Sequence, residues 1–229
     1  MDEFVTTFTQ TVSNPLVAKV VTALQRAIAS DGKLPAEVLG IQGMSGRKYR
    51  LFINNLIESI NDARYLEVGV LAGSTLCSAI HGNKVRAVAI DNWSQFGAPS
   101  AQFLANLSRF KTADARVSFL ESDFRAVDFG ALGRFNVYLF DGPHDFKDQR
   151  DGVVLALPAL DHHCVLIVDD WNWPQVRQGT FAAIREAGMT IDYMAEIRTS
   201  LDDKHAPVSG LQSDWHNGYF IAAVSKTDE

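Results

Sequence analysis

One turn in the middle of the sequence constrains the fold more than any other feature. Residues 65–75, with the sequence YLEVGVLAGST, have the pattern of a buried strand that enters a turn and then opens a helix. Gly69 and Gly73 lack a Cβ, so the backbone can bend tightly there and a flat or extended ligand can lie against bare amide groups. The segment therefore predicts a ligand-binding turn that follows a strand of an open α/β sheet.

Glu67 discriminates between the ligands that such a turn can hold. A dinucleotide-binding turn has glycine at the corresponding position and holds a diphosphate over the N-terminus of the helix. A carboxylate that points into the turn would repel a diphosphate and attract a cationic ligand. Glu67 therefore favours a cationic nucleoside-type cofactor over a nicotinamide dinucleotide. A nicotinamide-dependent oxidoreductase remains the alternative.

The segments after residue 63 predict a doubly wound α/β fold. Short apolar strands alternate with helical segments, which is typical of a mostly parallel sheet. Several strands are apolar at consecutive positions, as expected when helices cover both faces of the sheet. Two final segments, 190–197 and 219–225, predict a closing hairpin with an antiparallel last strand, joined by the polar loop 198–218. We therefore predict a seven-stranded sheet, whose other five strands are 64–70, 85–91, 117–120, 135–141 and 164–170.

The first sixty residues show helical patterns. Asn14 and Pro15 supply a helix start, and the apolar residues that follow as far as Ile28 keep to one face. A second helix is predicted over 47–60. We therefore predict a helical extension at residues 1–60, ahead of a cofactor-binding domain at residues 61–229. The apolar extension also suggests a homodimer formed through these helices.

Composition excludes several function classes. The chain has 229 residues, 47% of them hydrophobic, which fits one α/β core. The formal net charge of -6, with Lys and Arg scattered along the chain, argues against a nucleic-acid partner and favours small substrates. The acidic start and the lack of a long apolar run predict neither a signal peptide nor a membrane span, and hence a cytoplasmic protein. Cys77 and Cys164 have no metal-type or redox-type spacing and are expected to be reduced packing residues.

Acidic residues follow the predicted strands at the edge where ligands bind in such sheets. Asp91 ends the second strand, where a carboxylate accepts hydrogen bonds from ribose hydroxyls, and we assign the adjacent Asn92 and Trp93 to the same site. Asp123 follows the third strand and is expected to accept the amino group of an adenine, with Phe124 packed on the ring. The alternative for each acidic residue is an N-cap of the next helix.

Three carboxylates and one histidine are predicted to meet at the same edge. Asp141 closes one strand, and Asp169 and Asp170 close its neighbour. Such carboxylates repel one another and need protons or a cation, and an all-oxygen set suits Mg²⁺. The alternative is that Asp170 caps the next helix and that Asp169 makes an ordinary strand-end hydrogen bond. His144 follows Asp141 by three residues and is expected to lie over the same pocket. It is either a general base or a turn residue without a catalytic role.

Aromatic residues near these acids are candidates for an acceptor pocket. Trp171, Trp173 and Trp215 are expected either to wall that pocket or to lie in the core. His205 and His216 lie in the loop before the last strand, where they are candidate substrate contacts. The loop itself carries no recognisable pattern.

The arrangement Glu-x-Gly-x-x-x-Gly-x-Thr, from Glu67 to Thr75, resembles the first motif of class I S-adenosylmethionine-dependent methyltransferases. Together with the spacing of Asp141, His144, Asp169 and Asp170, it resembles the metal-dependent O-methyltransferases over the chain from residue 43 onward. Catechol-type members have lysine where this chain has His144 and asparagine where it has Asp170. The chain is more similar to the macrocin-type and mycinamicin-type sugar O-methyltransferases, which have a histidine and an acidic pair there.

This resemblance implies a cofactor site and a reaction. By the resemblance, Met44 and Ser45 belong to a segment that covers the cofactor, and Ser74 belongs to the glycine motif. The implied activity is a Mg²⁺-assisted methyl transfer from S-adenosylmethionine to a hydroxyl of a small molecule such as a vicinal diol, a sugar or a phenol. The alternatives are a non-catalytic module that binds an adenosyl cofactor, a nicotinamide-dependent oxidoreductase and a metal-dependent hydrolase.

Overall fold

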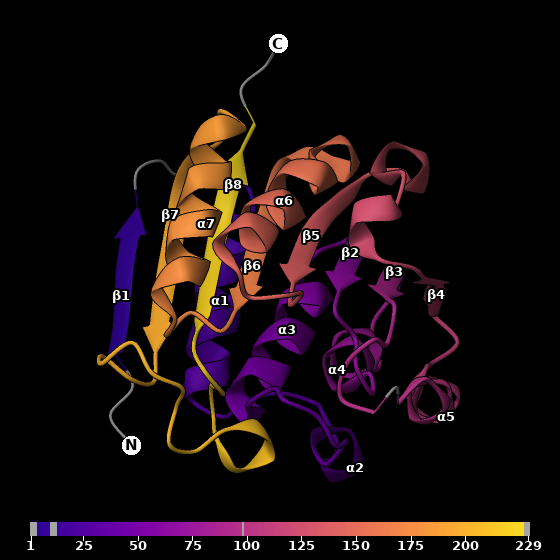
Figure 1. The fold of residues 1–229 in the computed structure, drawn as a ribbon. Helices are drawn as coiled ribbons and strands as arrows, with labels where there is room; N and C mark the ends of the chain where they lie inside the picture. Colours follow the sequence, from indigo (N-terminus) through magenta and orange to yellow (C-terminus); the bar gives the residue numbers. More distant parts are fainter. Residues whose placement is uncertain (1–3, 10–12, 98, 227–229) are drawn as a thin grey trace.

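The fold is built on one eight-stranded sheet with the strand order β1-β7-β8-β6-β5-β2-β3-β4 (Figure 1). The structure, a computed structural model, describes residues 4–9, 13–97 and 99–226. The strands are β1 (Phe4–Thr9), β2 (Ala63–Val68), β3 (Val85–Asp91), β4 (Ala115–Glu121), β5 (Phe135–Phe140), β6 (Leu160–Asp169), β7 (Thr190–Arg198) and β8 (Tyr219–Ser225). The helices are α1 (Val17–Ile28), α2 (Ala36–Leu39), α3 (Arg47–Ser59), α4 (Ser74–Ile80), α5 (Ser100–Phe110), α6 (Phe146–Ala156) and α7 (Pro174–Glu186).

The strand directions follow the predicted pattern. Strands β4, β3, β2, β5 and β6 pair in parallel, while β8 runs antiparallel to both β6 and β7. The carboxyl ends of the five parallel strands therefore meet at one edge of the sheet, where ligands bind in open α/β folds. The doubly wound, mostly parallel sheet with an antiparallel last strand is confirmed.

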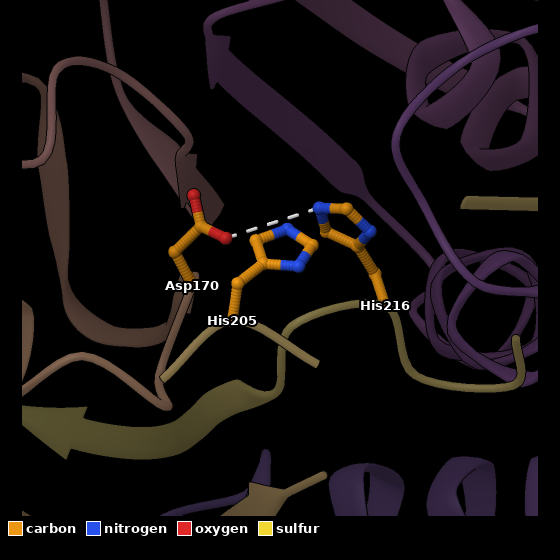
Figure 2. A group of neighbouring side chains, drawn as sticks. All are labelled: Asp170, His205 and His216. Carbon is orange, nitrogen blue, oxygen red and sulfur yellow. Dashed lines mark ion pairs between the residues drawn. The ribbon is translucent and has the colours of Figure 1, made fainter. Parts of the chain in front are cut away.

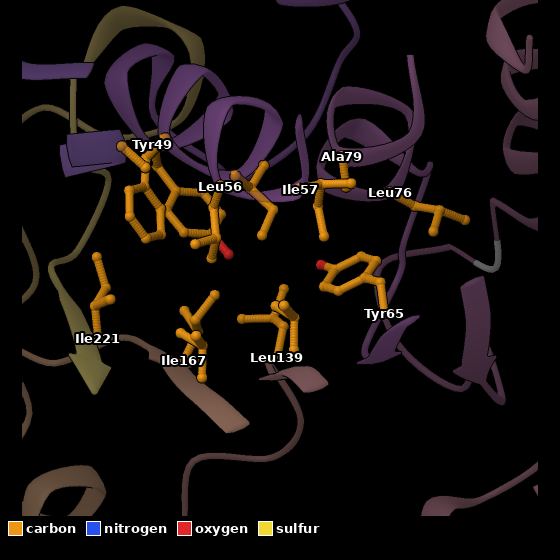
Figure 3. Close-up of a cluster of buried hydrophobic side chains, with 14 of the residues drawn as sticks. Tyr49, Leu56, Ile57, Tyr65, Leu76, Ala79, Leu139, Ile167 and Ile221 are labelled. Atoms are coloured by element: carbon orange, nitrogen blue, oxygen red, sulfur yellow. The ribbon is translucent and has the colours of Figure 1, made fainter. Parts of the chain in front are cut away.

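Helices cover both faces of the sheet. On one face, α1, α3 and α4 pack on the sheet residues Tyr65, Ile167 and Ile221, with Leu56 of α3 and Leu76 of α4 among the fully buried contacts (Figure 3). On the other face, α6 and α7 cover a second apolar cluster. Full burial of one such aliphatic side chain contributes about 1.5–3 kcal/mol. The N-terminal helices thus share one hydrophobic core with the sheet, and the homodimer through them stays a prediction.

The N-terminal segment differs from its helical prediction at one place. Residues Phe4–Thr9 form strand β1, which pairs antiparallel with β7 and adds the eighth strand. An edge strand is stabilised by backbone hydrogen bonds to its neighbour, and those bonds leave no signature in the sequence of the strand itself. The predicted N-terminal helical extension therefore also contains a strand, and the sheet has eight strands where seven were predicted.

The start of α1 also differs by two residues. The helix begins at Val17, and the Asn14 carboxamide oxygen accepts a hydrogen bond from the Leu16 amide at 2.9 Å. The Asn14 amide nitrogen donates to Asp192 Oδ2 at 2.8 Å and to the Val224 carbonyl at 3.2 Å. Asn14 therefore ties the chain to β7 and β8 in addition to turning it into the helix.

The turn between β2 and α4 has the backbone that its glycines predict. Gly69 has a φ of +85°, and Gly73 has a φ of +82° at the N-terminus of α4. A Cβ on Gly69 would lie 1.8 Å from the carbonyl oxygen of Asp141, which follows β5. Strands β2 and β5 therefore approach each other so closely at their carboxyl ends that glycine is required.

We expect Gly69→Ala to destabilise the protein far more than Gly97→Ala, as measured by urea denaturation. Both glycines have a positive φ, +85° and +78°, but a Cβ on Gly97 would meet no atom of the described residues beyond its chain neighbours within 4 Å. Backbone strain alone costs about 1–2 kcal/mol at either position, and only Gly69→Ala adds a clash with backbone. Equal losses in the two variants would contradict the close approach.

Candidate active site

A cavity of about 470 Å³ opens at the carboxyl ends of the parallel strands. Its walls come from the turn after β2, the segment after β3, the ends of β5 and β6, and the loop before β8. The predicted residues at its cofactor end are Met44, Ser45, Gly69, Ser74 and Thr75. Of the residues predicted to bind the cofactor or a metal or to act in catalysis, only Glu67 and Gly73 are not among its lining.

Asp91 holds the shape of the glycine turn. Its Oδ2 accepts hydrogen bonds from the amides of Val70 at 2.7 Å and Leu71 at 2.8 Å, and its Oδ1 accepts one from the Trp93 amide at 2.7 Å. The Trp93 indole donates in turn to the Leu71 carbonyl at 2.8 Å. A carboxylate has about four acceptor sites, so Asp91 keeps capacity for a ligand hydroxyl. Asp91 and Trp93, together with Asn92, line the cavity as predicted.

Glu67 does not point into the turn as expected. Its side chain is fully buried outside the cavity lining, and both of its carboxyl oxygens have no hydrogen-bond partner among the described residues. The alternation of the strand puts Glu67 on the same face as Tyr65, beneath α3 and α4. Burial raises the pKa of Glu67 well above its ordinary value. A carboxyl held toward its neutral form repels a diphosphate weakly, so the electrostatic argument from Glu67 against a dinucleotide does not hold.

A buried arginine supports the cofactor end of the cavity, and sequence reasoning missed it. Arg50 of α3 donates from Nε to Ser45 Oγ at 2.9 Å, and Ser45 Oγ lies 3.0 Å from Ser74 Oγ. Arg50 also donates to the carbonyls of Leu39 and Ile41 at 2.9 and 2.7 Å. Burial lowers the pKa of Arg50 to about 10. This network fixes two hydroxyl groups at the start of α4, where an anionic group of a ligand is favoured.

Asp123 and Phe124 line the cavity next to each other, but they already have protein partners. Asp123 accepts a hydrogen bond from the Arg125 amide at 2.9 Å and pairs with its guanidinium at 3.1 Å, so the N-cap alternative is realised. Phe124 is buried. Its ring centroid lies 5.2 Å from that of Phe140 and 4.4 Å from the Cζ of Arg125. Their contact with an adenine stays a prediction.

At the other end of the cavity, Asp141, His144 and Asp170 come together. One ligand atom from each lies within 4.8 Å of the others. His144 Nε2 lies 2.6 Å from Asp170 Oδ2. Burial alone would lower the pKa of His144, but the hydrogen bond and charge of Asp170 outweigh burial and raise it. Burial, followed by repulsion from Asp170, raises the pKa of Asp141 to about 7.

Asp169 lies beside this group rather than within it. Its Oδ1 accepts a hydrogen bond from the Asp170 amide at 2.7 Å, and the Tyr219 hydroxyl lies 3.3 Å from its Oδ2. The predicted strand-end hydrogen bond of Asp169 is therefore present. Burial, followed by the charge of Asp141, raises the pKa of Asp169 well above its ordinary value.

The group of Asp141, His144 and Asp170 could hold a divalent cation, with Asp169 beside it. Asp141, Asp169 and Asp170 all line the cavity, and two of them hold a pKa above the ordinary range because negative charges are buried together. A cation relieves this repulsion, and carboxylate oxygens are the ligands that Mg²⁺ prefers. When it is protonated, His144 places a positive charge next to Asp170, because its Nε2 lies 2.6 Å from Asp170 Oδ2.

The loop before β8 adds two histidines to the cavity wall. His205 and His216 each place a ring nitrogen within 4.8 Å of Asp170, and His216 Nε2 lies 3.8 Å from Asp170 Oδ1 (Figure 2). Burial lowers the pKa of His216 to about 4. Asn217 anchors the loop, because it donates to Asp170 Oδ1 at 2.8 Å and accepts from the Ala206 amide at 2.9 Å. Asparagine in a polar loop gave no sequence signal for this role.

Of the three tryptophans predicted to lie in the acceptor pocket or in the core, one lines the cavity and two are in the core. Trp173 lines the cavity and makes an edge contact with the His144 ring at 4.8 Å. Trp171 is fully buried and stacks on Phe220 at 4.5 Å, and Trp215 is fully buried outside the cavity lining. The pocket-wall alternative is therefore correct for Trp173 and wrong for the other two.

Comparison with known proteins finds a matching domain family and structures of similar fold. Residues 66–171 match the profile of a family described as a methyltransferase domain. No curated protein matches the sequence. In the part of the chain that the structure describes, every helix is too short or too polar to cross a membrane.

Solved structures of methyltransferases share the fold at low sequence identity. The SAH-bound methyltransferase PaMTH1 of Podospora anserina has a TM-score of 0.57 and 12% identity, with 92% of this chain and 88% of that chain covered. A protein of Klebsiella pneumoniae assigned as an O-methyltransferase has a TM-score of 0.53 and 16% identity, with 93% of this chain and 91% of that chain covered. A protein of Pyrococcus horikoshii assigned as an RNA methyltransferase, PH1948, has a TM-score of 0.53 and 18% identity, with 89% of this chain and 97% of that chain covered. Residues 66–171 thus match a methyltransferase domain, and the chain shares the fold of these methyltransferases.

We expect the contribution of Asp141 to the stability of the metal-free protein to fall as the pH rises. Between the ordinary pKa of 3.8 and the raised value of about 7, Asp141 binds more protons in the folded than in the unfolded state. The contribution of Asp141 to the free energy of unfolding must therefore fall as the pH rises across this window. His216, whose pKa is lowered to about 4, contributes in the opposite sense, so the effect of Asp141 is measured by comparison with a variant. Urea denaturation in EDTA at several pH values measures the slope.

The matched variant is Asp141→Asn, which removes one of the groups responsible. Its slope should be smaller than that of the wild type, although Glu67 and Asp169 have shifts of the same sign and leave part of the slope in place. A slope unchanged by the substitution would contradict the raised pKa of Asp141.

Proposed function

We propose that the protein is a Mg²⁺-assisted O-methyltransferase that transfers the methyl group of S-adenosylmethionine to a hydroxyl of a small molecule. The observation that carries the proposal is the placement of Asp141, His144 and Asp170 in the same cavity as the glycine turn. A base and a set of cation ligands next to a cofactor turn are the parts that hydroxyl methylation requires.

The cofactor end of the cavity suits S-adenosylmethionine. Asp91 supports the ribose contact, because it lines the cavity and retains acceptor capacity. The hydroxyls of Ser45 and Ser74, at the N-terminus of α4, suit the carboxylate of the methionine part. The acidic residues around the cavity favour the positive charge of the sulfonium. When bound, the cofactor supplies a methyl group that this charge already activates.

The residues of the chain then align the acceptor and move one proton. The Nε2–H of His144 faces Asp170, which leaves the lone pair on Nδ1 to accept the proton of the acceptor hydroxyl. Trp173 packs against His144 and limits water on that side. Asp141, Asp169 and Asp170 would hold a divalent cation, which would supply positive charge to the acceptor site. Alignment alone can contribute about 7–11 kcal/mol.

A small acceptor is favoured over RNA. The chain has a formal net charge of -6, and the cavity that holds the predicted base is lined by five carboxylates. These are Asp91, Asp123, Asp141, Asp169 and Asp170. Nucleic acids bind through many phosphate contacts to basic side chains, and Arg125 is the single Lys or Arg among the described residues that line the cavity. The cavity volume of about 470 Å³ lies in the range of small-molecule sites.

We expect methyl transfer to require a divalent cation. Release of S-adenosylhomocysteine, measured over a screen of vicinal diols, sugars and phenols, should stop in excess EDTA and return with Mg²⁺. Asp141→Asn should abolish the Mg²⁺ response while calorimetry still shows cofactor binding, because the substitution leaves Asp91 and the glycine turn in place. Undiminished transfer in excess EDTA would contradict the metal role.

We expect His144→Gln to lower kcat about 10²–10⁴-fold, the range for loss of a general base. The affinity for S-adenosylmethionine, measured by calorimetry, should change little, because His144 lies at the acceptor end of the cavity. Recovery of full activity in the variant at higher pH would mean that His144 only orients the acceptor.

A further inference from the structure

We propose that His205, His216 and Asp170 bind a second hydroxyl group of the acceptor, distinct from the one that receives the methyl group. The inference rests on the proposed function and narrows its substrate to polyhydroxylated molecules such as sugars and polyols. Its basis is the pattern of hydrogen-bond donors and acceptors that the loop before β8 presents to the cavity (Figure 2).

The proton of the His216 ring is on Nε2. The amide of Gly210 donates a hydrogen bond to His216 Nδ1 at 3.0 Å. An amide N–H only donates, so Nδ1 carries the lone pair and the neutral ring carries its proton on the other nitrogen. The Nε2 nitrogen lies 3.8 Å from Asp170 Oδ1, beyond the donor–acceptor distance of a hydrogen bond. His216 therefore presents a donor at the cavity that Asp170 does not satisfy.

His205 has the opposite tautomer. Its Nδ1 lies 2.9 Å from the carbonyl oxygen of Ala206. A carbonyl only accepts, so Nδ1 carries the proton and Nε2 carries a lone pair. The cluster thus combines one donor, from His216, with two acceptors, from His205 and Asp170. A hydroxyl group accepts one hydrogen bond and donates one, and this set satisfies both.

The same tautomers argue against a second metal ion at this cluster. A histidine that binds a metal needs a lone pair on the ligating nitrogen and donates its other N–H to an acceptor. His205 meets this condition through Ala206. His216 does not, because its lone pair already accepts from Gly210 and its proton faces Asp170.

The backbone around His216 is held by several hydrogen bonds, as a specificity site requires. The amide of His216 donates to Ser213 Oγ at 2.9 Å, and the His216 carbonyl accepts from Thr199 Oγ1 at 3.0 Å. The side chain of Asn172 bridges to Thr199 and to Asn217 at 2.9 Å each. The ring of His216 is therefore positioned before any ligand binds.

Two substitutions separate the two nitrogens of His216. His216→Asn keeps an acceptor near the Gly210 amide and removes the donor at Nε2. His216→Gln extends an amide N–H toward the position of Nε2. Asparagine also tolerates the left-handed backbone of this residue, whose φ is +45°. Calorimetry with S-adenosylmethionine checks that both variants fold.

The experiment compares acceptors that differ by one hydroxyl. Release of S-adenosylhomocysteine with Mg²⁺ is measured for methyl α-glucopyranoside and its 2-deoxy, 3-deoxy and 4-deoxy forms, and for catechol and phenol. We expect the wild type to prefer the acceptor with the extra hydroxyl by about tenfold or more in kcat/KM. His216→Asn should lose that preference, and His216→Gln should keep part of it. A preference that persists in His216→Asn would overturn the subsite and assign the selectivity to the cation ligands.

A second measurement decides the subsite without turnover. Long-range ¹H–¹⁵N correlation spectra of the histidine rings in the metal-free protein should show a proton on Nε2 of His216 and on Nδ1 of His205. A proton on Nδ1 of His216, or ligation of added Zn²⁺ by both rings, would overturn the proposal. Lack of methyl release from every acceptor would instead count against the proposed function, while the spectra still decide the donor pattern.

Discussion

The close approach of β2 and β5 at their carboxyl ends is the constraint on which the site depends. Gly69 lies against the carbonyl of Asp141, at a distance that leaves no space for a Cβ, and the Asp141 amide donates to the Val68 carbonyl at 2.9 Å. The turn that would hold the cofactor and the carboxylate that would hold the cation therefore follow two paired strands. Their relative position is set by backbone packing rather than by flexible side chains.

Two aspartates connect this pair of strands to the rest of the cavity. Asp91 accepts hydrogen bonds from both sides of the cofactor end, from Val70 and Leu71 in the glycine turn and from Trp93 after β3. Asp170 uses its two oxygens in opposite directions, with Oδ2 toward His144 and Oδ1 toward Asn217. The proposed base and the loop before β8 are thus tied to one carboxylate.

Local patterns predicted most of the sheet and much of the site. The bounds of β3 and β8 coincide with their predicted ranges, because buried strands between turns have a strong apolar signal. Asp141, His144 and Asp170 were predicted to meet, because parallel strands place their carboxyl ends at one edge. Strand β1 was missed, since an edge strand depends on its neighbour. Asn217 and Arg50 were missed too, because their contacts cross long stretches of sequence.

The sequence by itself determined the alternation of strands and helices, the glycine turn, and the strand-end positions of the acidic residues. These follow from side-chain size, backbone freedom and periodicity, which are local properties. Only the tertiary structure decided which way those side chains point. Glu67 turned beneath α3 instead of toward the ligand, Trp171 turned into the core, and the loop before β8 brought His216 to Asp170. Burial and hydrogen-bond partners depend on segments that are distant in the chain, so no local pattern records them.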